Sequence, residues 1–418
     1  MSLDVHSFGC RLNSLEAAVM RSNAGAAGLE DAVLINTCAV TAEAVRQARQ
    51  LIRRARRERP GVPIIVSGCA VQVDPQGFAA MPEIDLLLGN AEKLRPEDWQ
   101  AFRQSGGRVR VGDIMAERTA SRAAVAEIEG HTRAFLSIQN GCDHRCTFCV
   151  IPFGRGPSRS VPMGAVVDSV RDLVARGHSE VVLTGVDITA FGADLPGRPT
   201  LGRLVAAILK LVPELPRLRL SSLDTIEVDA ALMTVIADEP RLMPHFHLSL
   251  QAGDDMILKR MKRRHGRDDA IRFCADVRAR RPDAVFGADL IAGFPTETDA
   301  MFAQTAALVE DCGLTHLHVF PFSPRPGTPA ARMPQLPGDT IKARAAELRA
   351  LGRRRLDAFL DSEVGARRSV LAERGGRGRT EHFTEVAIAD VEPGTLVDAR
   401  IIGRSASGLL AMPIERAA

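Results

Sequence analysis

The stretch NGCDHRCTFCVIPFGRG, residues Asn140–Gly156, contains three cysteines in the spacing C-x3-C-x2-C. They are Cys142, Cys146 and Cys149, and they follow directly on an apolar segment with the length of a strand, Ala134–Gln139. Three thiolates on one loop can hold a four-iron cluster by three of its corners, whereas complete cysteine ligation would use four. The fourth iron then stays open to a small molecule, and S-adenosylmethionine (SAM) could chelate it through its amino and carboxylate groups.

A structural zinc site is the alternative for this loop, with His144 or a distant residue as the fourth ligand. Zinc sites usually pair their cysteines as C-x2-C, and no second cysteine pair follows downstream. The cysteines also lie at a strand end, ahead of a long strand–helix series. We therefore favour an iron–sulfur cluster over zinc.

Six strand-like segments alternate with helical patterns in the central part of the chain. They are Ala134–Gln139, Glu180–Thr184, Arg217–Ser221, His245–Leu250, Ala284–Ile291 and His316–Phe320. A closed barrel of this kind needs eight strands, so six predict a partial (β/α)6 barrel. We expect this domain to span residues 128–360 and to end in a long helix, Thr340–Leu360.

The N-terminal part repeats the strand–helix pattern on a smaller scale and predicts a parallel α/β domain within residues 1–120. The expected strands are Leu3–Phe8, Ala32–Asn36, Pro63–Ser67 and Ile84–Leu88, and the expected helices are Leu15–Ala26 and Val45–Ala55. The stretch Arg95–Ala126 is low in apolar residues, and we interpret it as a linker with minor structure.

Three N-terminal cysteines, Cys10, Cys38 and Cys69, each come just after an expected strand and before an expected helix. In a parallel α/β sheet such positions share one edge, so these residues should meet in space. Any one of them could be a small buried hydrophobic residue. Three at the same topological position favour a second three-cysteine cluster. Cys274 and Cys312 lie in helical stretches without this context, and we interpret them as ordinary thiols.

The C-terminal part changes character. Two short β-like runs, Val386–Ile388 and Leu396–Ile402, are separated from their surroundings by turn-forming segments such as GGRGR and EPG. Residues 361–418 are therefore predicted to form a small all-β domain.

Composition limits the class of protein. The chain has 418 residues, of which 45% are hydrophobic and 25% charged, as is ordinary for soluble globular domains. No signal peptide is evident, and no apolar run approaches the ~18 residues of a membrane span. We expect a cytoplasmic protein, in which eight cysteines are metal ligands or buried thiols rather than disulfides.

The net charge of +3 does not by itself establish a nucleic-acid partner, so the placement of charge matters more. The second expected helix carries seven arginines between Arg46 and Arg59. Arg46, Arg49, Arg53 and Arg56 fall opposite its apolar stripe, where they form either a solvated basic face or a phosphate-binding face. The second basic segment, Arg374–Arg379, favours RNA contact.

Together these features resemble the methylthiotransferase family of radical SAM enzymes over nearly the whole chain. The N-terminal cysteines, the C-x3-C-x2-C loop and the C-terminal domain occur in the family's order. Further matching segments are LTGVDITAFG (Leu183–Gly192), RLSSLD (Arg219–Asp224), HLSLQAGDDMILKRMKR (His247–Arg263), DLIAGFPTET (Asp289–Thr298) and FSPRPGTPAARM (Phe322–Met333).

The resemblance implies two [4Fe–4S] clusters and two uses of SAM. One SAM is cleaved to a 5′-deoxyadenosyl radical at the barrel cluster, and another supplies a methyl group. The N-terminal cluster carries or donates sulfur, and the product is a methylthio group on an unactivated C–H position. Such a carbon offers no acid, base or leaving group for polar chemistry, so a radical is required. The C-terminal domain resembles the RNA-binding TRAM domain.

The resemblance also implies a substrate. Arg11–Leu12–Asn13 after Cys10 is similar to the family branch that acts on N6-threonylcarbamoyladenosine at position 37 of tRNA, next to the anticodon. The alternatives are isopentenyladenosine in tRNA, an aspartate of a ribosomal protein, and a metal-bearing RNA-binding protein without catalysis. Arg binds carboxylates with paired donors, so Arg11 could hold the threonyl carboxylate or could instead pair with Glu16.

Other expected contacts follow the strand ends. The resemblance implies that Phe148, before the last loop cysteine, lies by the SAM adenine. Gly185, Ser222, Asp224, Gln251 and Asp289 are the other expected SAM contacts, and Arg11, Asn13 and Arg325 are the expected substrate contacts. Each of them could also be a turn, cap or loop residue. The implied partners are the tRNA anticodon stem-loop and an electron donor such as flavodoxin or ferredoxin, with the sulfur donor unassigned and no membrane.

Overall fold

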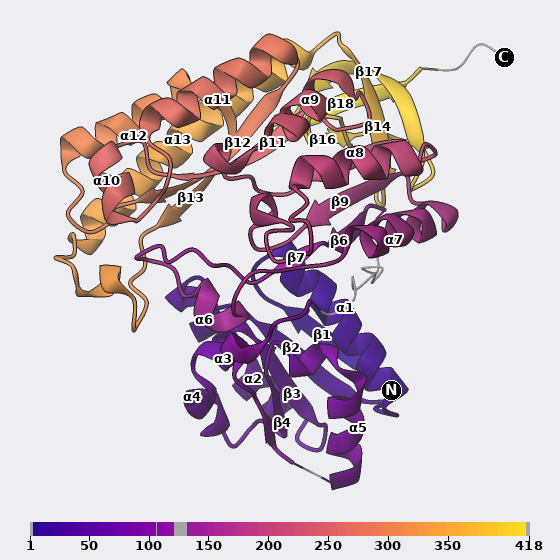
Figure 1. Cartoon of the computed structure of the whole chain (residues 1–418), viewed down its shortest axis with the longest axis vertical. Coiled ribbons are helices and arrows are strands. Elements are labelled where there is room, and N and C mark those ends of the chain that lie inside the picture. Colours follow the sequence, from indigo (N-terminus) through magenta and orange to yellow (C-terminus); the bar gives the residue numbers. More distant parts are fainter. Residues whose placement is uncertain (1–2, 106, 121–131, 415–418) are drawn as a thin grey trace.

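The computed structural model describes residues 3–105, 107–120 and 132–414. The N-terminal domain lies at one end of the molecule, the barrel domain lies against it, and the C-terminal strands lie beside the barrel (Figure 1). Among the described residues, no helix is long and apolar enough to cross a bilayer. The fold is mixed α/β with a small C-terminal sheet domain, which confirms the predicted fold class.

The N-terminal sheet has five parallel strands in the order β1-β2-β3-β4-β5. The strands are β1 (Leu3–Ser7), β2 (Ala32–Thr37), β3 (Ile64–Gly68), β4 (Leu86–Leu88) and β5 (Val109–Arg110). The helices are α1 (Arg11–Ala26), α2 (Ala42–Glu58), α3 (Cys69–Val73), α4 (Pro75–Ala79) and α5 (Pro96–Ser105), with short 3-10 turns at Glu92–Leu94 and Ile114–Ala116. Strand β2 is buried at every residue, as expected for a parallel sheet covered on both faces.

The prediction that Arg95–Ala126 is a linker with minor structure is wrong in part, because this stretch contains helix α5 and edge strand β5. Trp99 of α5 is fully buried and donates its indole N–H to the carbonyl of Lys93 at 3.0 Å. Trp99, with Phe102 packed against the same core, therefore fixes a helix whose other residues are mostly polar.

The barrel domain has the six expected strands, arranged as two three-stranded parallel sheets, β10-β9-β6 and β11-β12-β13. The strands are β6 (Ala134–Ser137), β9 (Glu180–Thr184), β10 (Arg217–Leu220), β11 (His245–Gln251), β12 (Val285–Ala292) and β13 (Leu314–Pro321), with a small β7 (Gln139–Asn140) and β8 (Arg159–Ser160) pair. Isolated bridges Leu218–Leu242 and Leu223–Leu248 join the two sheets, so the six strands form one curved, partial barrel.

Helices mostly cover the strands of this domain, but the first of them packs against α3 of the N-terminal domain (Figure 1). They are α6 (Ile151–Arg155), α7 (Met163–Ala175), α8 (Leu201–Leu211), α9 (Ala230–Asp238), α10 (Asp255–Arg260), α11 (Arg267–Arg280), α12 (Asp299–Asp311) and α13 (Gly338–Glu363). Short 3-10 turns lie at Ile188–Ala190, Thr225–Glu227 and Pro329–Arg332. Cys274 on α11 and Cys312 after α12 are buried in the main core beside one another, in keeping with ordinary thiols.

The C-terminal strands close into a barrel in the order β14-β15-β16-β18-β17. They are β14 (Arg367–Glu373), β15 (Arg377–Arg379), β16 (Glu385–Ala387), β17 (Leu396–Arg404) and β18 (Leu409–Pro413). Of these, the sequence predicted only β16 and β17. Strand β14 has a mixed polar and apolar surface, and β15 is too short to carry an alternating pattern.

Candidate active site

The structure brings Cys10, Cys38 and Cys69 together at the carboxyl ends of three adjacent strands, β1, β2 and β3. The Cys38 thiol accepts a hydrogen bond from the Val40 backbone N–H at 3.4 Å. Burial and then the proximity of Cys69 and Cys10 raise the pKa of Cys38 to about 11. Thiols held protonated this way need an added positive charge to become thiolates, and bound metal supplies one.

The loop cysteines form the second trio, after β7 at the carboxyl end of the first barrel strand. Burial raises the pKa of Cys149 to about 12. The Cys149 sulfur accepts the Ile151 backbone N–H at 3.4 Å, and the Cys146 sulfur accepts from Arg263 Nη1 at 3.7 Å. Backbone hydrogen bonds from the Cys142 N–H to Gly156 and from the Cys149 N–H to Cys146 fix the loop.

Neither trio is spaced for a single metal ion. Tetrahedral zinc thiolates have Zn–S bonds of ~2.3 Å, which put their sulfurs about 4 Å apart. Within the described residues, no three cysteine sulfurs lie within 4.8 Å of one another. Wider spacing suits a polynuclear cluster, in which each cysteine binds a different iron.

The zinc alternative expected His144 to lie near the loop cysteines. His144 does lie near Cys142, but the third group beside them is Asp187 and not Cys146 or Cys149. His144 Nε2 lies 2.9 Å from Asp187 Oδ2, and the Cys142 sulfur lies 3.7 Å from the same oxygen. These three groups lie within 4.8 Å of one another. The loop trio itself therefore remains a separate arrangement of thiols.

The two trios face each other across the domain boundary. Helix α6, which follows Cys149, packs against α3, which begins at Cys69. A Cβ added to Gly154 would lie only 3.3 Å from the Cys69 Cβ, so glycine permits this approach. Asn90 donates to the Gly154 carbonyl and, at 3.6 Å, to the Cys69 sulfur. The fold thus brings the two trios close together, near enough for the thiols of Cys69 and Cys149 to act on one another electrostatically.

A fully buried charge network supports this boundary. Glu16 on α1 lies 2.6 Å from Lys93 Nζ and 2.7 Å from Arg155 Nη1. Burial alone raises the pKa of Glu16, but Arg155 and Lys93 outweigh it and bring the pKa down to about 2. Two cations against one carboxylate leave a surplus positive charge beside Cys69 and Cys10. Such a buried surplus requires an anion, and an iron–sulfur cluster on three thiolates is one.

Asn13 belongs to this network and is only 1% exposed. Its amide donates to the carbonyls of Phe8 at 2.8 Å and Thr37 at 3.0 Å, and its oxygen accepts from Arg155. Its hydrogen-bonding groups are therefore occupied, so the expected substrate contact is corrected to a structural role: Asn13 orients the turns that carry Cys10 and Cys38.

Arg11 does not pair with Glu16, because Lys93 and Arg155 occupy that carboxylate. Instead its guanidinium carbon lies 4.9 Å from the ring centroid of Phe383, which the C-terminal barrel contributes. Burial, and then the nearby positive charges of Arg133, Arg219 and Arg379, lower the pKa of Arg11 to about 10. Sequence reasoning missed this contact between the first helix and the C-terminal barrel.

The expected SAM contacts lie along the carboxyl ends of the barrel strands. Gly185 follows β9, and a Cβ there would meet the Gln139 carbonyl oxygen at 2.7 Å. Its close backbone approach is thus to Gln139. Gln251 ends β11 with a φ of +70°, a left-handed conformation that turns the chain away from the strand. Phe148 packs edge-on against Phe294, with ring centroids 6.5 Å apart.

The remaining expected SAM contacts are partly committed to protein groups. Asp224 Oδ2 lies 2.7 Å from Arg263 Nη2, while Asp224 Oδ1 is buried and lies 3.7 Å from His265 Nδ1, beyond hydrogen-bond distance. Ser222, half-buried, lies two residues earlier. Asp289 Oδ1 sits between two imidazoles, 2.8 Å from His247 and 3.3 Å from His318. Burial raises the pKa of Asp289, but the two histidines have the larger effect, so the pKa of Asp289 is lowered overall.

Arg325 lies in the loop after β13, near the N-terminal cysteine trio. Burial lowers the pKa of its guanidinium, and the proximity of Cys38 opposes that shift. Its Nε is buried without a hydrogen-bond partner among the described residues. The same loop touches the N-terminal domain through Ser323, which accepts the Ala42 backbone N–H at 3.4 Å. The barrel loop therefore brings a cation to the auxiliary cysteines.

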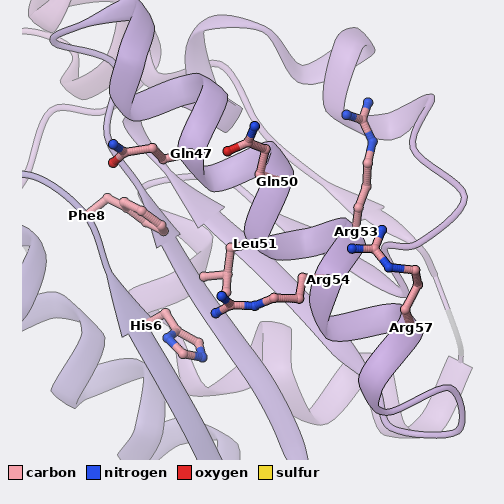
Figure 2. Close-up of a pocket in the computed structure, with 8 residues that line it drawn as sticks. All are labelled: His6, Phe8, Gln47, Gln50, Leu51, Arg53, Arg54 and Arg57. Atoms are coloured by element: carbon pink, nitrogen blue, oxygen red, sulfur yellow. The ribbon is translucent and has the colours of Figure 1, made fainter.

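Helix α2 carries its basic residues in two groups. Arg46, Arg49 and Arg56 are engaged with Glu43, Asp74 and Asp85. That engagement weakens the predicted phosphate-binding face. The other group lines an open groove of about 620 Å³ between α2 and edge strand β1, drawn in Figure 2. Its lining residues are His6, Phe8, Gln47, Gln50, Leu51, Arg53, Arg54 and Arg57.

Comparisons with known proteins agree with this architecture. The radical SAM superfamily matches residues 136–309, and a family described as uncharacterized protein family UPF0004 matches residues 2–89. The structure of TsrM, a radical SAM methyltransferase from Kitasatospora setae, is similar in fold, with a TM-score of 0.59, 16% identity and coverage of 79% of this chain and 74% of TsrM. By fold, this is a radical SAM protein.

Sequence relatives define the family more narrowly. The threonylcarbamoyladenosine tRNA methylthiotransferase MtaB of Rickettsia prowazekii is 48% identical, covering 96% of this chain and 94% of the relative. MtaB of Aquifex aeolicus is 33% identical, covering 92% of this chain and 96% of the relative. A tRNA-2-methylthio-N(6)-dimethylallyladenosine synthase of Cereibacter sphaeroides is 33% identical, covering 99% of this chain and 98% of the relative. The chain belongs to the methylthiotransferase family of radical SAM enzymes.

Proposed function

We propose that this protein is a tRNA methylthiotransferase that adds a methylthio group to C2 of N6-threonylcarbamoyladenosine at position 37. The observation that carries the proposal is the pair of facing cysteine trios joined through α3 and α6. The substrate assignment is supported by the relative of 48% identity, whose name specifies threonylcarbamoyladenosine, against 33% for relatives named for dimethylallyladenosine.

Each trio is assigned one cluster. Cys142, Cys146 and Cys149 hold the cluster at which SAM binds, and Cys10, Cys38 and Cys69 hold the auxiliary cluster. When bound, these groups supply reductive cleavage of SAM and the sulfur that is transferred. The contribution of the chain is to hold the two trios close together through α3 and α6 and to place Arg325 and Arg11 next to the auxiliary trio.

Contacts to SAM are assigned to groups at the barrel's carboxyl edge. Asp224 Oδ1 is buried, and its polar neighbour His265 Nδ1 lies 3.7 Å away, so this oxygen can accept from the methionyl amine or the ribose. Ser222 and Gln251 lie at the same edge. Phe148 offers an aromatic face next to Cys149, and the backbone at Gly185 approaches the same loop through Gln139. Asp289 lies deeper in the barrel, held by His247.

The RNA is assigned to two surfaces. The α2 groove offers Arg53 and Arg57, which have no carboxylate partner among the described residues, and Phe8, two positions before Cys10. The C-terminal barrel, residues 361–418, serves as the TRAM-like RNA-binding domain beside domains 1–120 and 128–360. Phosphate contacts on these surfaces would bring the anticodon stem-loop to the site in the cytoplasm, with flavodoxin or ferredoxin as the reductant.

The test is mass spectrometry of tRNA nucleosides from a deletion strain and from the strain complemented with this chain. Loss of 2-methylthio-N6-threonylcarbamoyladenosine on deletion, restored by complementation, is the expected result. Loss of the methylthio-isopentenyl nucleoside instead would move the protein to the other tRNA branch. An unchanged nucleoside profile with loss of a methylthio-aspartate from a ribosomal protein would remove RNA as the substrate.

A further inference from the structure

Four arginines surround one aromatic ring where the three domains meet. The guanidinium carbons of Arg11, Arg133, Arg219 and Arg379 lie 4.9, 4.8, 5.0 and 5.1 Å from the ring centroid of Phe383. The residues come from α1, from the segment entering β6, from β10, and from β15 with the turn after it. Phe383 itself has a φ of +65°, a left-handed conformation that bulky residues rarely adopt.

Two of these arginines are paired with carboxylates. Arg219 donates to both oxygens of Glu180, at 3.0 and 3.2 Å, and Arg379 Nη2 lies 3.0 Å from Glu385. Their positive charge is therefore largely balanced inside the protein, although Arg379 Nε, 3.7 Å from Glu373, is buried without a hydrogen-bond partner among the described residues.

The other two arginines, Arg11 and Arg133, have N–H donors without hydrogen-bond partners among the described residues. Arg133 is only 8% exposed, and one of its nitrogens lies 2.8 Å from Glu373. Its Nε and Nη1 are buried without hydrogen-bond partners among the described residues. Arg11 as a whole residue is partly open to solvent, but its guanidinium is enclosed beside Phe383; Glu180 acts on it electrostatically, and the part of the chain that the structure describes gives it no hydrogen-bond partner. Buried guanidinium donors left unpaired are costly, and a bound anion would satisfy them.

We propose that Arg11 and Arg133, stacked against Phe383, bind the carboxylate of the threonylcarbamoyl side chain; this rests on the proposed function. A carboxylate matches the paired donors of a guanidinium, and it is small enough to reach a side chain as buried as Arg133. Because Arg11 directly follows Cys10, an anchored carboxylate would hold the base next to the auxiliary trio. The C-terminal barrel would then contribute to substrate selection as well as to RNA binding.

The test compares two tRNAs with the reconstituted holoenzyme. One carries threonylcarbamoyladenosine-37, and the other carries the same nucleoside with its carboxylate capped as a methylamide. The wild-type enzyme is expected to show a KM about 10- to 100-fold lower for the free carboxylate, the range typical of hydrogen bonds to a charged group. In Arg11→Gln this preference should fall toward onefold, with the KM for the capped tRNA unchanged.

Arg53→Gln on α2 is the matched control, because it should raise the KM for both tRNAs by the same factor and keep the preference. Arg133→Gln is a second variant that should also lose the preference. Equal use of both tRNAs by the wild type, or an Arg11→Gln enzyme that keeps the full preference, would overturn the carboxylate site while leaving the function intact. Failure of the wild type to modify either tRNA would instead refute the proposed function.

Discussion

Arg155 and Glu16 form a buried, two-pronged ion pair, with Nη1 to Oε1 at 2.7 Å and Nη2 to Oε2 at 2.9 Å. The two residues are 139 positions apart. Arg155 ends the short helix that follows the loop cysteines, and Glu16 lies on the helix that follows Cys10. This pair therefore ties the two cysteine trios to each other, and the spacing between the trios depends on it.

Breaking this pair should destabilise the protein strongly. In Arg155→Gln, Glu16 loses its two-pronged partner while remaining buried, so the free energy of unfolding should fall by about 3–5 kcal/mol. Urea unfolding followed by circular dichroism measures the change. Arg171→Gln, which removes an exposed pair with Asp168, is the control and should cost less than ~1 kcal/mol. Equal, small losses in both variants would show that the buried pair does not hold the boundary.

The same pair predicts a pH dependence. The pKa of Glu16 is lowered to about 2 in the folded protein, below its ordinary value of 4.5. The unfolded chain therefore binds the proton more tightly, so the stabilisation is complete above about pH 4.5 and is lost as pH falls toward 2. The difference in the free energy of unfolding between the metal-free wild type and Glu16→Gln should therefore shrink as the pH falls from about 4.5 toward 2. A difference that stays constant down to pH 3 would contradict the assignment.

Gly68 tests the geometry of the auxiliary trio. Gly68 lies immediately before Cys69 and has a φ of +107°. A Cβ added to Gly68 would collide with the Thr37 backbone. Gly68→Ala should displace Cys69 and lower the iron content of reconstituted protein from about eight per chain toward about four. Gly164→Ala on α7 has open space around it and should keep the full iron content. Iron and sulfide analysis checks both variants, and an unaltered iron content in Gly68→Ala would argue against the site.

The α2 groove predicts a salt-dependent contribution to tRNA binding. Each of Arg53→Gln and Arg57→Gln should weaken binding of different tRNAs alike and reduce the slope of log K against log salt by about one. Filter binding at several salt concentrations measures this slope. Arg171→Gln, a basic residue on a different helix, should leave it unchanged, and a slope unaffected by the groove variants would remove this surface from the interface.

The convergence of the N-terminal cysteines could be predicted from sequence because it depends on topology alone. Any residue that directly follows a parallel strand lies at the same sheet edge, so Cys10, Cys38 and Cys69 had to be neighbours once the strands were recognised. The barrel strands were likewise recognisable as short runs between helical patterns, although β10, β11 and β13 alternate apolar residues with polar or charged ones.

The remaining features depend on contacts between distant segments. Helix α5 was missed because only two aromatic side chains, Trp99 and Phe102, rather than a long apolar stripe, hold it to the sheet. Arg133 and Phe383 lie about 250 positions apart and carry no local signal, so their contact appears only when the C-terminal barrel is placed. Asn13 was expected to touch substrate, since the sequence does not reveal that the Phe8 and Thr37 carbonyls enclose it.

The most direct test is iron, sulfide and product analysis of a triple Cys10→Ala, Cys38→Ala, Cys69→Ala variant reconstituted without oxygen. Two separate clusters predict that iron falls from about eight to about four per chain, with no methylthio nucleoside formed. Cys312→Ala, which removes a buried thiol outside both trios, should keep about eight irons. A triple variant that retained the full iron content and still produced the methylthio nucleoside would contradict the two-cluster site.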